Sequence, residues 1–288
     1  MSGEATIRAY GPSDFEALVR LIGDAFGGES PDSVRFVVSA ANTATFVAEL
    51  DGAVVGVSMA ISFGQTAWIG NVVVSADCRR RGLGMSLTEA ACRAAGDHAE
   101  TVLLLALGDA RRLYERLGFV ADGLYGTWTA TASTPAIVQA AKDVADVRRA
   151  AAAARPDTVQ QCLALDRRAT GEDRRAYLEY FIPAMTAAWR GDGEDDAGQV
   201  TGYAARLSWG TGAVVADDVE VARGLLCDLL RQIPTVRVEF PDANDAGVRL
   251  ATDLGLERVK ENLRMRLGPP VAGYRPQAVY KALTPAVG

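Results

Sequence analysis

A short arginine- and glycine-rich segment is the part of this sequence best suited to binding an anion. The run Arg79-Arg80-Arg81-Gly82-Leu83-Gly84 follows residues 68–74, whose β-branched side chains predict a buried strand. A helical pattern of apolar residues begins at Leu83. A strand, a glycine loop and a helix start aim unpaired N–H groups and a helix dipole at one point. Because Gly82 and Gly84 have no side chain, phosphate oxygens can approach the main chain. We therefore predict a cradle for a pyrophosphate.

This loop differs from the two best-known phosphate-binding loops. No Gly-Lys-Ser/Thr follows it, and Leu87 stands where the dinucleotide fingerprint has its third glycine. The alternative interpretation is structural: the two glycines form only a tight turn, and the three arginines only a solvated surface. The rest of the chain has to decide between these readings.

Length and composition restrict the class of protein. A chain of 288 residues suggests about two domains. Its net charge of −6 argues against a general nucleic-acid binder. No apolar run approaches the roughly 18 residues that cross a membrane, and the N-terminal segment has no apolar signal-peptide core. We expect a cytoplasmic protein that binds no membrane, and the sequence leaves open whether it forms a homodimer.

The cysteines and the single histidine exclude several kinds of site. No Cys-x-x-Cys pair occurs, and His98 is the only imidazole, so neither a zinc site nor a disulfide framework is supported. A lone histidine also argues against Ser-His-Asp and Cys-His mechanisms. We expect no metal cofactor.

The elements around the glycine loop predict an α+β fold, with helices flanking a mixed, mostly antiparallel sheet. The dipeptide Asp51-Gly52 predicts a hairpin, and Gly118 predicts a helix C-cap. Strands are expected at 6–8, 45–50, 53–62, 68–74, 101–107, 119–121 and 125–130, and helices from Phe15, at 33–40, from Leu83 and at 109–117.

Two motifs in this half resemble one known family. The segment Val72-Val73-Val74-Ser75-Ala76-Asp77-Cys78-Arg79-Arg80-Arg81-Gly82-Leu83-Gly84 resembles the acyl-CoA pyrophosphate motif of the GNAT N-acetyltransferase superfamily, Arg/Gln-x-x-Gly-x-Gly/Ala. Farther along, Ala110-Arg111-Arg112-Leu113-Tyr114-Glu115-Arg116-Leu117-Gly118-Phe119 is similar to that superfamily's second motif. The resemblance covers residues 6–130.

The resemblance implies acetyl-CoA as cosubstrate and assigns its binding residues. The pantetheine arm would lie between the fourth and fifth strands, bonded to backbone groups, and a backbone N–H near Val72 would stabilise the oxyanion. Arg79 would also help to fix the loop. The implied cofactor-binding residues are Val72, Val73, Val74, Arg79, Arg80, Arg81, Gly82, Leu83 and Gly84. Tyr114 matches the tyrosine that protonates the departing CoA thiolate; its alternative role is that of a core aromatic residue.

The chain departs from the family pattern at three positions. Leu107 replaces an asparagine that often contacts the pantetheine, and Met85 replaces a frequent serine or threonine. Trp68 stands where some relatives carry a glutamate base. The general base therefore stays open between an ordered water chain, a water positioned by Asn71, and a carboxylate from the second half.

Residues 143–288 look like a second, degenerate copy of the first half. The segment that begins at Asn244 and ends at Leu256 parallels the second motif, and aligning Gly118 with Gly255 places Ala251 opposite Tyr114. Asp217-Asp218-Val219-Glu220 replaces the glycine loop, and its carboxylates would repel a pyrophosphate. The alternative is an unrelated α/β domain.

The segment 165–174, the pair Arg264-Met265 and the tail with Tyr274-Arg275-Pro276 and Val279-Tyr280 resemble parts of two-domain acetyltransferases with a degenerate C-terminal half. In that architecture the second domain closes one side of the acceptor cleft. Asp173 and Arg174 would face the substrate or, as we favour, cap a helix.

We therefore expect a catalytic domain at 1–131, a linker at 132–142 and a degenerate domain at 143–288. The expected activity is transfer of acetyl from acetyl-CoA to a small-molecule amine by direct attack. The alternatives are a protein or peptide N-acetyltransferase and a non-catalytic acyl-CoA-sensing module.

Overall fold

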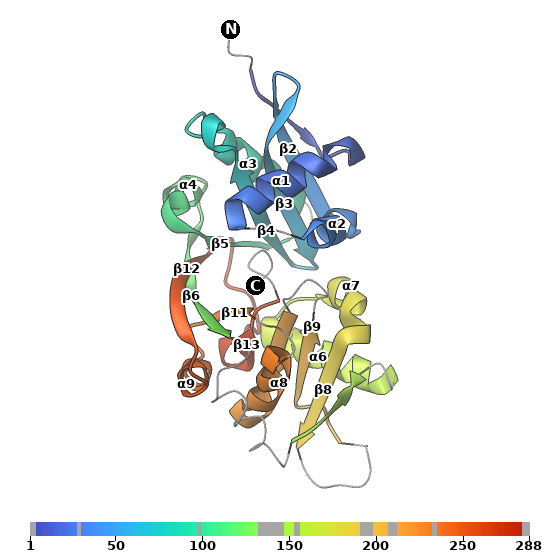
Figure 1. Ribbon diagram of the computed structural model, residues 1–288. Helices are drawn as coiled ribbons and strands as arrows, with labels where there is room; N and C mark the ends of the chain where they lie inside the picture. The colour runs from blue at the N-terminus through green and yellow to red at the C-terminus, as the bar shows by residue number, and fades with distance from the viewer. Residues whose placement is uncertain are drawn as a thin grey trace. The chain divides into compact units, whose positions relative to one another are not determined.

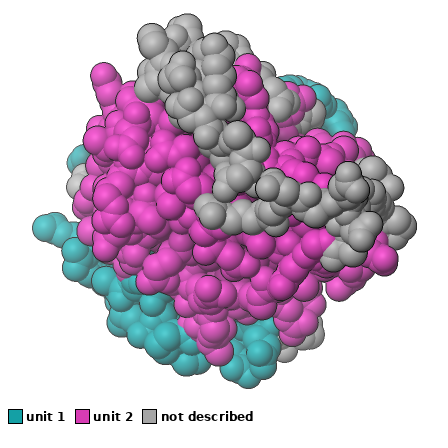
Figure 2. All heavy atoms as spheres, turned by 90° about the horizontal axis from the view of Figure 1, so that it is seen from below, with its two compact units in different colours: residues 1–122, 264–270, 287 teal, residues 123–263, 271–286, 288 magenta. Residues whose placement is uncertain are grey.

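The computed structural model describes residues 4–27, 30–96, 99–131, 147–152, 156–190, 198–206, 212–231 and 235–283 (Figure 1). His98 and the predicted linker, 132–142, lie outside these ranges. The chain divides into two compact units, coloured separately in Figure 2. Unit 1 comprises residues 1–122 and 264–270, and unit 2 comprises 123–263 and 271–286. Among the described residues, none of the helices has the length and apolar character needed to span a membrane.

Unit 1 is built on a sheet whose strand order is β1-β2-β3-β4-β5, with the C-terminal end of β12 beside β5. The strands from β1 to β4 pair antiparallel with one another, and β4 pairs parallel with β5. Its elements are β1 Thr6–Ala9, α1 Phe15–Phe26, α2 Pro31–Ser39, β2 Thr43–Leu50, β3 Ala53–Phe63, β4 Thr66–Val74, α3 Leu83–Gly96, β5 Thr101–Ala106, α4 Arg111–Arg116 and the start of β6 Val120–Thr131.

The two faces of this sheet are covered by different helices. Side chains of α1 and α2, such as Leu18 and Val34, pack with Val57 and Met59 on one face. On the other face, Leu87 of α3 packs with Ala48 and Leu83. The hairpin predicted at Asp51-Gly52 is confirmed, with both residues at positive φ of 50° and 79°. The sheet thus holds β4 and the start of α3 in fixed positions.

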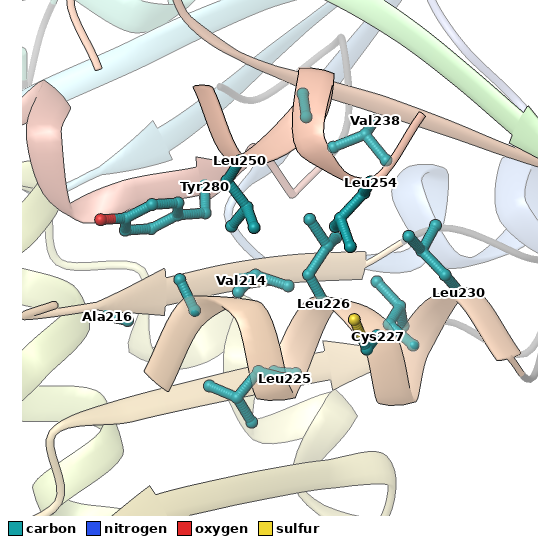
Figure 3. Packing of buried hydrophobic residues seen from close by; sticks show 14 of the residues in the cluster. Val214, Ala216, Leu225, Leu226, Cys227, Leu230, Val238, Leu250, Leu254 and Tyr280 are labelled. Carbon is teal, nitrogen blue, oxygen red and sulfur yellow. The ribbon is translucent and has the colours of Figure 1, made fainter. Parts of the chain in front are cut away.

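Unit 2 contains a separate sheet of five strands in the order β13-β10-β9-β8-β7. It also contains most of β12, β6 and β11, which are the last three strands of the eight-stranded sheet that begins with β1. Its elements are β7 Val147–Ala151, α6 Pro156–Thr170, α7 Arg175–Leu178, β8 Met185–Arg190, β9 Gly202–Arg206, β10 Gly212–Ala216, α8 Val219–Arg231, β11 Thr235–Pro241, α9 Asp245–Asp253, β12 Glu257–Leu267 and β13 Val279–Lys281. A large apolar cluster joins α8, α9 and β10, and Leu225, Leu226 and Leu250 are among its members (Figure 3).

The duplicated fold predicted from the sequence is confirmed. The first half runs β1-α1-α2-β2-β3-β4-α3-β5-α4-β6, and the second half repeats this order as β7-α6-α7-β8-β9-β10-α8-β11-α9-β12. Both sheets are mostly antiparallel and are flanked by helices.

The predicted domains, 1–131 and 143–288, are continuous in sequence, whereas each compact unit consists of more than one segment of the chain. Residues 123–131 of β6 belong to unit 2, where they pair with β11, and residues 264–270 belong to unit 1. The two halves therefore exchange segments at their last long strands.

One prediction in this region is wrong. Two separate strands were expected at 119–121 and 125–130, but β6 is continuous from Val120 to Thr131. Gly123 has a φ of 143°, so the glycine accommodates an irregularity within one strand.

Candidate functional site

The loop between β4 and α3 exposes its main chain. After β4 ends at Val74, a short 3₁₀ turn over Ala76–Cys78 leads to Arg80 and Gly82, which have positive φ values of 61° and 83°. The Arg79 guanidinium donates from Nε to the carbonyl oxygen of Val74 at 3.1 Å. This contact ties the loop to the end of the strand.

The amides of this loop are open. Gly82 acts as the N-cap of α3, because its carbonyl oxygen accepts from the amides of Met85 and Ser86 at 3.0 and 3.1 Å. For the amides of residues 80–84, no hydrogen-bond partner occurs within the described part of the chain. The side chains of Arg79, Arg80 and Arg81 are exposed around them. Open amides at a helix N-terminus with arginines nearby form a site suited to an anion.

The space at the two glycines supports this interpretation. A Cβ at Gly82 would meet no atom within 4 Å, so the main chain there is reachable from outside. A Cβ at Gly84 would lie 3.2 Å from Cδ1 of Leu113, which shows that α4 packs against the first turn of α3. This packing brings the two sequence motifs together in one unit.

The strands β4 and β5 diverge beside the loop. They pair only through Thr66–Trp68 and Thr101–Leu103, and beyond Trp68 the described residues of β4 pair with β3 alone. Asn71, three residues beyond the last pair with β5, has a φ of 51° and lies within a shift of the β3–β4 register. The edge of β4 that carries Val72, Val73 and Val74 can therefore bind an extended ligand through backbone groups. One lone pair of the Val74 carbonyl is already taken by Arg79.

Tyr114 lies on α4, next to this loop. Its side chain is 6% exposed, and its ring packs edge-on against Phe119 at 6.0 Å. Burial raises the pKa of Tyr114 to about 12, and the neighbouring Cys92 thiol adds a smaller effect in the same direction. The helix ends at Arg116 with Leu117 as its C-cap, and Gly118, the glycine predicted to terminate it, follows with a φ of 87°. The phenol is therefore protonated at neutral pH.

These observations fit the cofactor that the sequence resemblance implies. The open amides at residues 80–84 can hold a diphosphate, and the free edge of β4 can hold an extended arm. Tyr114 lies on the helix whose Leu113 contacts the loop.

A buried cluster on the same sheet was not predicted. Trp68 is 1% exposed, and the Arg264 guanidinium carbon lies 5.7 Å from the centre of its ring. Arg264 forms an ion pair with Asp122, and Arg266 Nε donates to the same carboxylate at 2.9 Å. Sequence patterns could not pair Arg264 with Asp122, because 142 residues separate them.

In the second unit the corresponding loop is closed by its own carboxylate. Asp218 precedes α8 as Gly82 precedes α3, and its Oδ1 accepts from the amides of Glu220 and Val221 at 2.9 and 3.0 Å. Asp217 lies 3.4 Å from the Arg168 guanidinium. These contacts use the helix N-terminus that is open in the first half.

Arg174 stands at the N-cap position of α7, but its side chain makes no capping hydrogen bond there and is buried. It forms an ion pair with Asp166 at 2.5 Å, and both side chains are at most 2% exposed. The hydroxyl of Tyr203 also donates to Asp166 at 2.5 Å. Asp173 precedes the N-cap residue, and its Oδ1 accepts from the Arg175 amide at the start of α7 at 3.4 Å.

We expect Asp166→Asn to lower the free energy of unfolding by about 3–5 kcal/mol, because it removes the carboxylate that pairs with the buried Arg174 guanidinium. Urea denaturation followed by circular dichroism would measure this. The control is Asp217→Asn, which removes the more exposed pair with Arg168 and is expected to cost less than about 1 kcal/mol. Equal losses in the two variants would contradict the structural role of Arg174.

Comparison with known proteins gives matches over both halves. The family models for a GNAT acetyltransferase domain match residues 41–121 and residues 162–281, which together make up more than half of the chain. No curated protein sequence matches the chain.

Solved structures share the fold along the whole chain. A protein from Pyrococcus horikoshii that is proposed to be an acetyltransferase is 22% identical, with a TM-score of 0.82, over 99% of this chain and 96% of that one. A tandem GNAT protein from the clavulanic acid biosynthesis pathway is 17% identical, with a TM-score of 0.64, over 92% and 99%. A GCN5-related N-acetyltransferase from Sphaerobacter thermophilus is 16% identical, with a TM-score of 0.64, over 97% of each chain. At these identities the likeness shows the fold alone.

Proposed function

The chain belongs to the GNAT acetyltransferase family, and from this premise we propose that it moves an acetyl group from acetyl-CoA to the primary amine of a small molecule. Family membership makes it an acyltransferase; the acyl donor, the acceptor and the residue roles are our proposal. The observation that carries it is the group of open amides at residues 80–84, beside the helix of Tyr114.

The first unit would bind acetyl-CoA mainly through its main chain. The amides from Arg80 to Gly84 would hold the diphosphate, with the guanidinium groups of Arg80 and Arg81 as electrostatic support. Arg79 would act mainly by fixing the loop through Val74. The free edge of β4 at residues 72–74 would hydrogen-bond the pantetheine arm. When bound, the thioester supplies an acyl group that an amine can attack directly.

Tyr114 would act as the general acid. Its phenol carries a proton across the physiological range and would transfer that proton to the departing thiolate sulfur. A backbone N–H near Val72 would donate to the carbonyl oxygen of the acyl group during attack. Trp68 cannot serve as a base, so deprotonation of the amine falls to water, to a water held by Asn71, or to a carboxylate.

The proposed acceptor is a small, cationic amine. The net charge of −6 favours the approach of such a substrate and disfavours polyanionic ones. Purified full-length protein, incubated with acetyl-CoA and a panel of small amines and peptides, should release free thiol with small amines. Release only with peptides would support the alternative of a peptide N-acetyltransferase. Measurable acetyl-CoA binding with no release in any mixture would support a sensing module and contradict the proposal.

The pH dependence of turnover follows from the raised pKa of Tyr114. A general acid loses activity as pH rises through its pKa, and here that loss moves from about 10 to about 12. At saturating substrates, we therefore expect no alkaline decline in kcat up to pH 10.5. Initial rates between pH 6 and 10.5, corrected for spontaneous thioester hydrolysis, test this. A kcat halved near pH 10 would show that the acid is a tyrosine with an ordinary pKa or another group.

A further inference from the structure

The C-terminal strand β13 is buried inside the second unit. Val279, Tyr280 and Lys281 are at most 4% exposed, and the following Ala282 and Leu283 are also buried. The Tyr280 ring belongs to the main apolar cluster (Figure 3). The second unit therefore contains a built place for this strand.

In the second unit, β13 lies between β10 and β11, the strands that correspond to the diverging pair of the first half. By element order β10 and β11 correspond to β4 and β5. The strand β13 pairs antiparallel with β10, where Val214 faces Lys281 and Val215 faces Val279. On its other side, the Ala282 amide donates to the Glu239 carbonyl oxygen of β11 at 2.6 Å. Among the described elements of the first half, β13 has no counterpart.

Asn244 holds the strand through its side chain. Its Nδ2 donates to the carbonyl oxygen of Val279 at 2.9 Å, and its Oδ1 accepts from the Gly247 amide at 2.8 Å and so caps α9. Asn244 precedes Gly255 by as many residues as Leu107 precedes Gly118. The second half thus has a side-chain amide at the position where the first half has an apolar residue, and this amide binds a peptide carbonyl of the same chain.

The charges in the second unit agree with a slot filled by protein. Asp218 uses the amides at the start of α8, as described above. Lys281 is buried close to the carboxylate of Glu239, and burial lowers the pKa of this lysine to about 8 while the carboxylate opposes the change. The attraction between the Lys281 ammonium and the Glu239 carboxylate favours this position of the strand, and the Thr127 hydroxyl also donates to Glu239 at 3.1 Å.

We propose that β13 is an internal ligand of the second half, lying in the strand-shaped slot that in the first half is open to acyl-CoA. This inference rests on the proposed function of the first half for the identity of the corresponding ligand. It follows that the chain has one acyl-CoA site and that the second half keeps its shape without a bound cofactor.

Hydrogen exchange of the full-length protein tests whether the slot holds β13. The amides of residues 279–282 should be protected without acetyl-CoA, and adding it should leave their rates unchanged. Asn244→Asp keeps an acceptor for the Gly247 amide but loses the donor to Val279, so these amides should exchange at least about 10-fold faster while α9 stays protected. Thr252→Ala, at an exposed position of α9, is the matched control and should change nothing at β13. Fast exchange of β13 in the unaltered protein, loss of protection on adding acetyl-CoA, or wild-type rates in Asn244→Asp would overturn the inference.

Calorimetric titration with acetyl-CoA tests the number of sites. One site is expected in the unaltered chain, and its dissociation constant should be at least about 100-fold higher in Gly82→Asp. A second site in either protein would show that the second half binds the cofactor and would refute the internal-ligand role. Absence of any binding would refute the proposed function instead, and the exchange rates would then decide the role of β13 alone.

Discussion

Replacing Tyr114 by phenylalanine is expected to lower kcat by about 10²- to 10⁴-fold and to leave the dissociation constant of acetyl-CoA unchanged. The phenol ring is buried against Phe119, and in the described part of the chain its hydroxyl has no hydrogen-bond partner. Removing that oxygen therefore leaves the packing intact and removes the proton donor for the thiolate. Steady-state rates of thiol release and calorimetric affinity measure the two quantities.

The matched control for this substitution is Tyr177→Phe. Tyr177 is also a buried tyrosine packed edge-on against a phenylalanine, Phe181, but it lies in the second unit and has no proposed role in the reaction. We expect its kcat to stay within about twofold of the unaltered enzyme. A Tyr114→Phe enzyme with full turnover would contradict the acid role. Loss of cofactor affinity together with turnover would point to a packing role.

Gly82→Asp is expected to weaken acetyl-CoA binding at least about 100-fold, or about 2.7 kcal/mol. The substitution gives the first half the residue type that the second half has before its corresponding helix, at Asp218. There the carboxylate accepts the amides of Glu220 and Val221. At position 82 it would compete with the diphosphate for the amides of α3 and repel its charge.

Two controls separate charge from backbone strain. Gly82→Ala places an uncharged side chain at the same φ of 83° and so has a similar backbone strain. We expect it to bind acetyl-CoA more tightly than Gly82→Asp does. Gly52→Asp introduces the same residue at another glycine of similar geometry, in the turn between β2 and β3, where φ is 79° and a Cβ would meet no atom within 4 Å. We expect this variant to bind acetyl-CoA with the affinity of the unaltered protein. Equal affinities of Gly82→Asp and the unaltered protein would show that the diphosphate lies elsewhere.

The sequence was most informative where local chemistry decides the structure. The glycines at 82 and 118 adopt the positive φ values that a loop before a helix and a helix C-cap require, and Asp51-Gly52 forms the predicted turn. The order strand, loop, helix at β4 and α3 was also predictable, because apolar periodicity changes at Leu83. The repeated element order of the second half was visible for the same reason.

Features that depend on distant partners could not be predicted from local patterns. The ion pair of Arg264 with Asp122 joins β12 to the start of β6, and the exchange of segments between the units depends on the same strands. The pairing of β13 with β10 joins two short apolar segments whose patterns carry no information about their partners. Arg174 takes the helix-start position that the sequence predicted, but the burial of its side chain against Asp166 depends on a partner that local patterns do not reveal.

The most direct test of the central proposal is an amide chemical-shift titration of ¹⁵N-labelled, deuterated protein with acetyl-CoA. We predict that the largest backbone shifts occur at residues 80–84, that smaller ones follow at residues 72–74, and that the amides of Glu220 and Val221 do not move. Unchanged signals at residues 80–84 in the presence of saturating acetyl-CoA would contradict the assignment of the diphosphate to this loop.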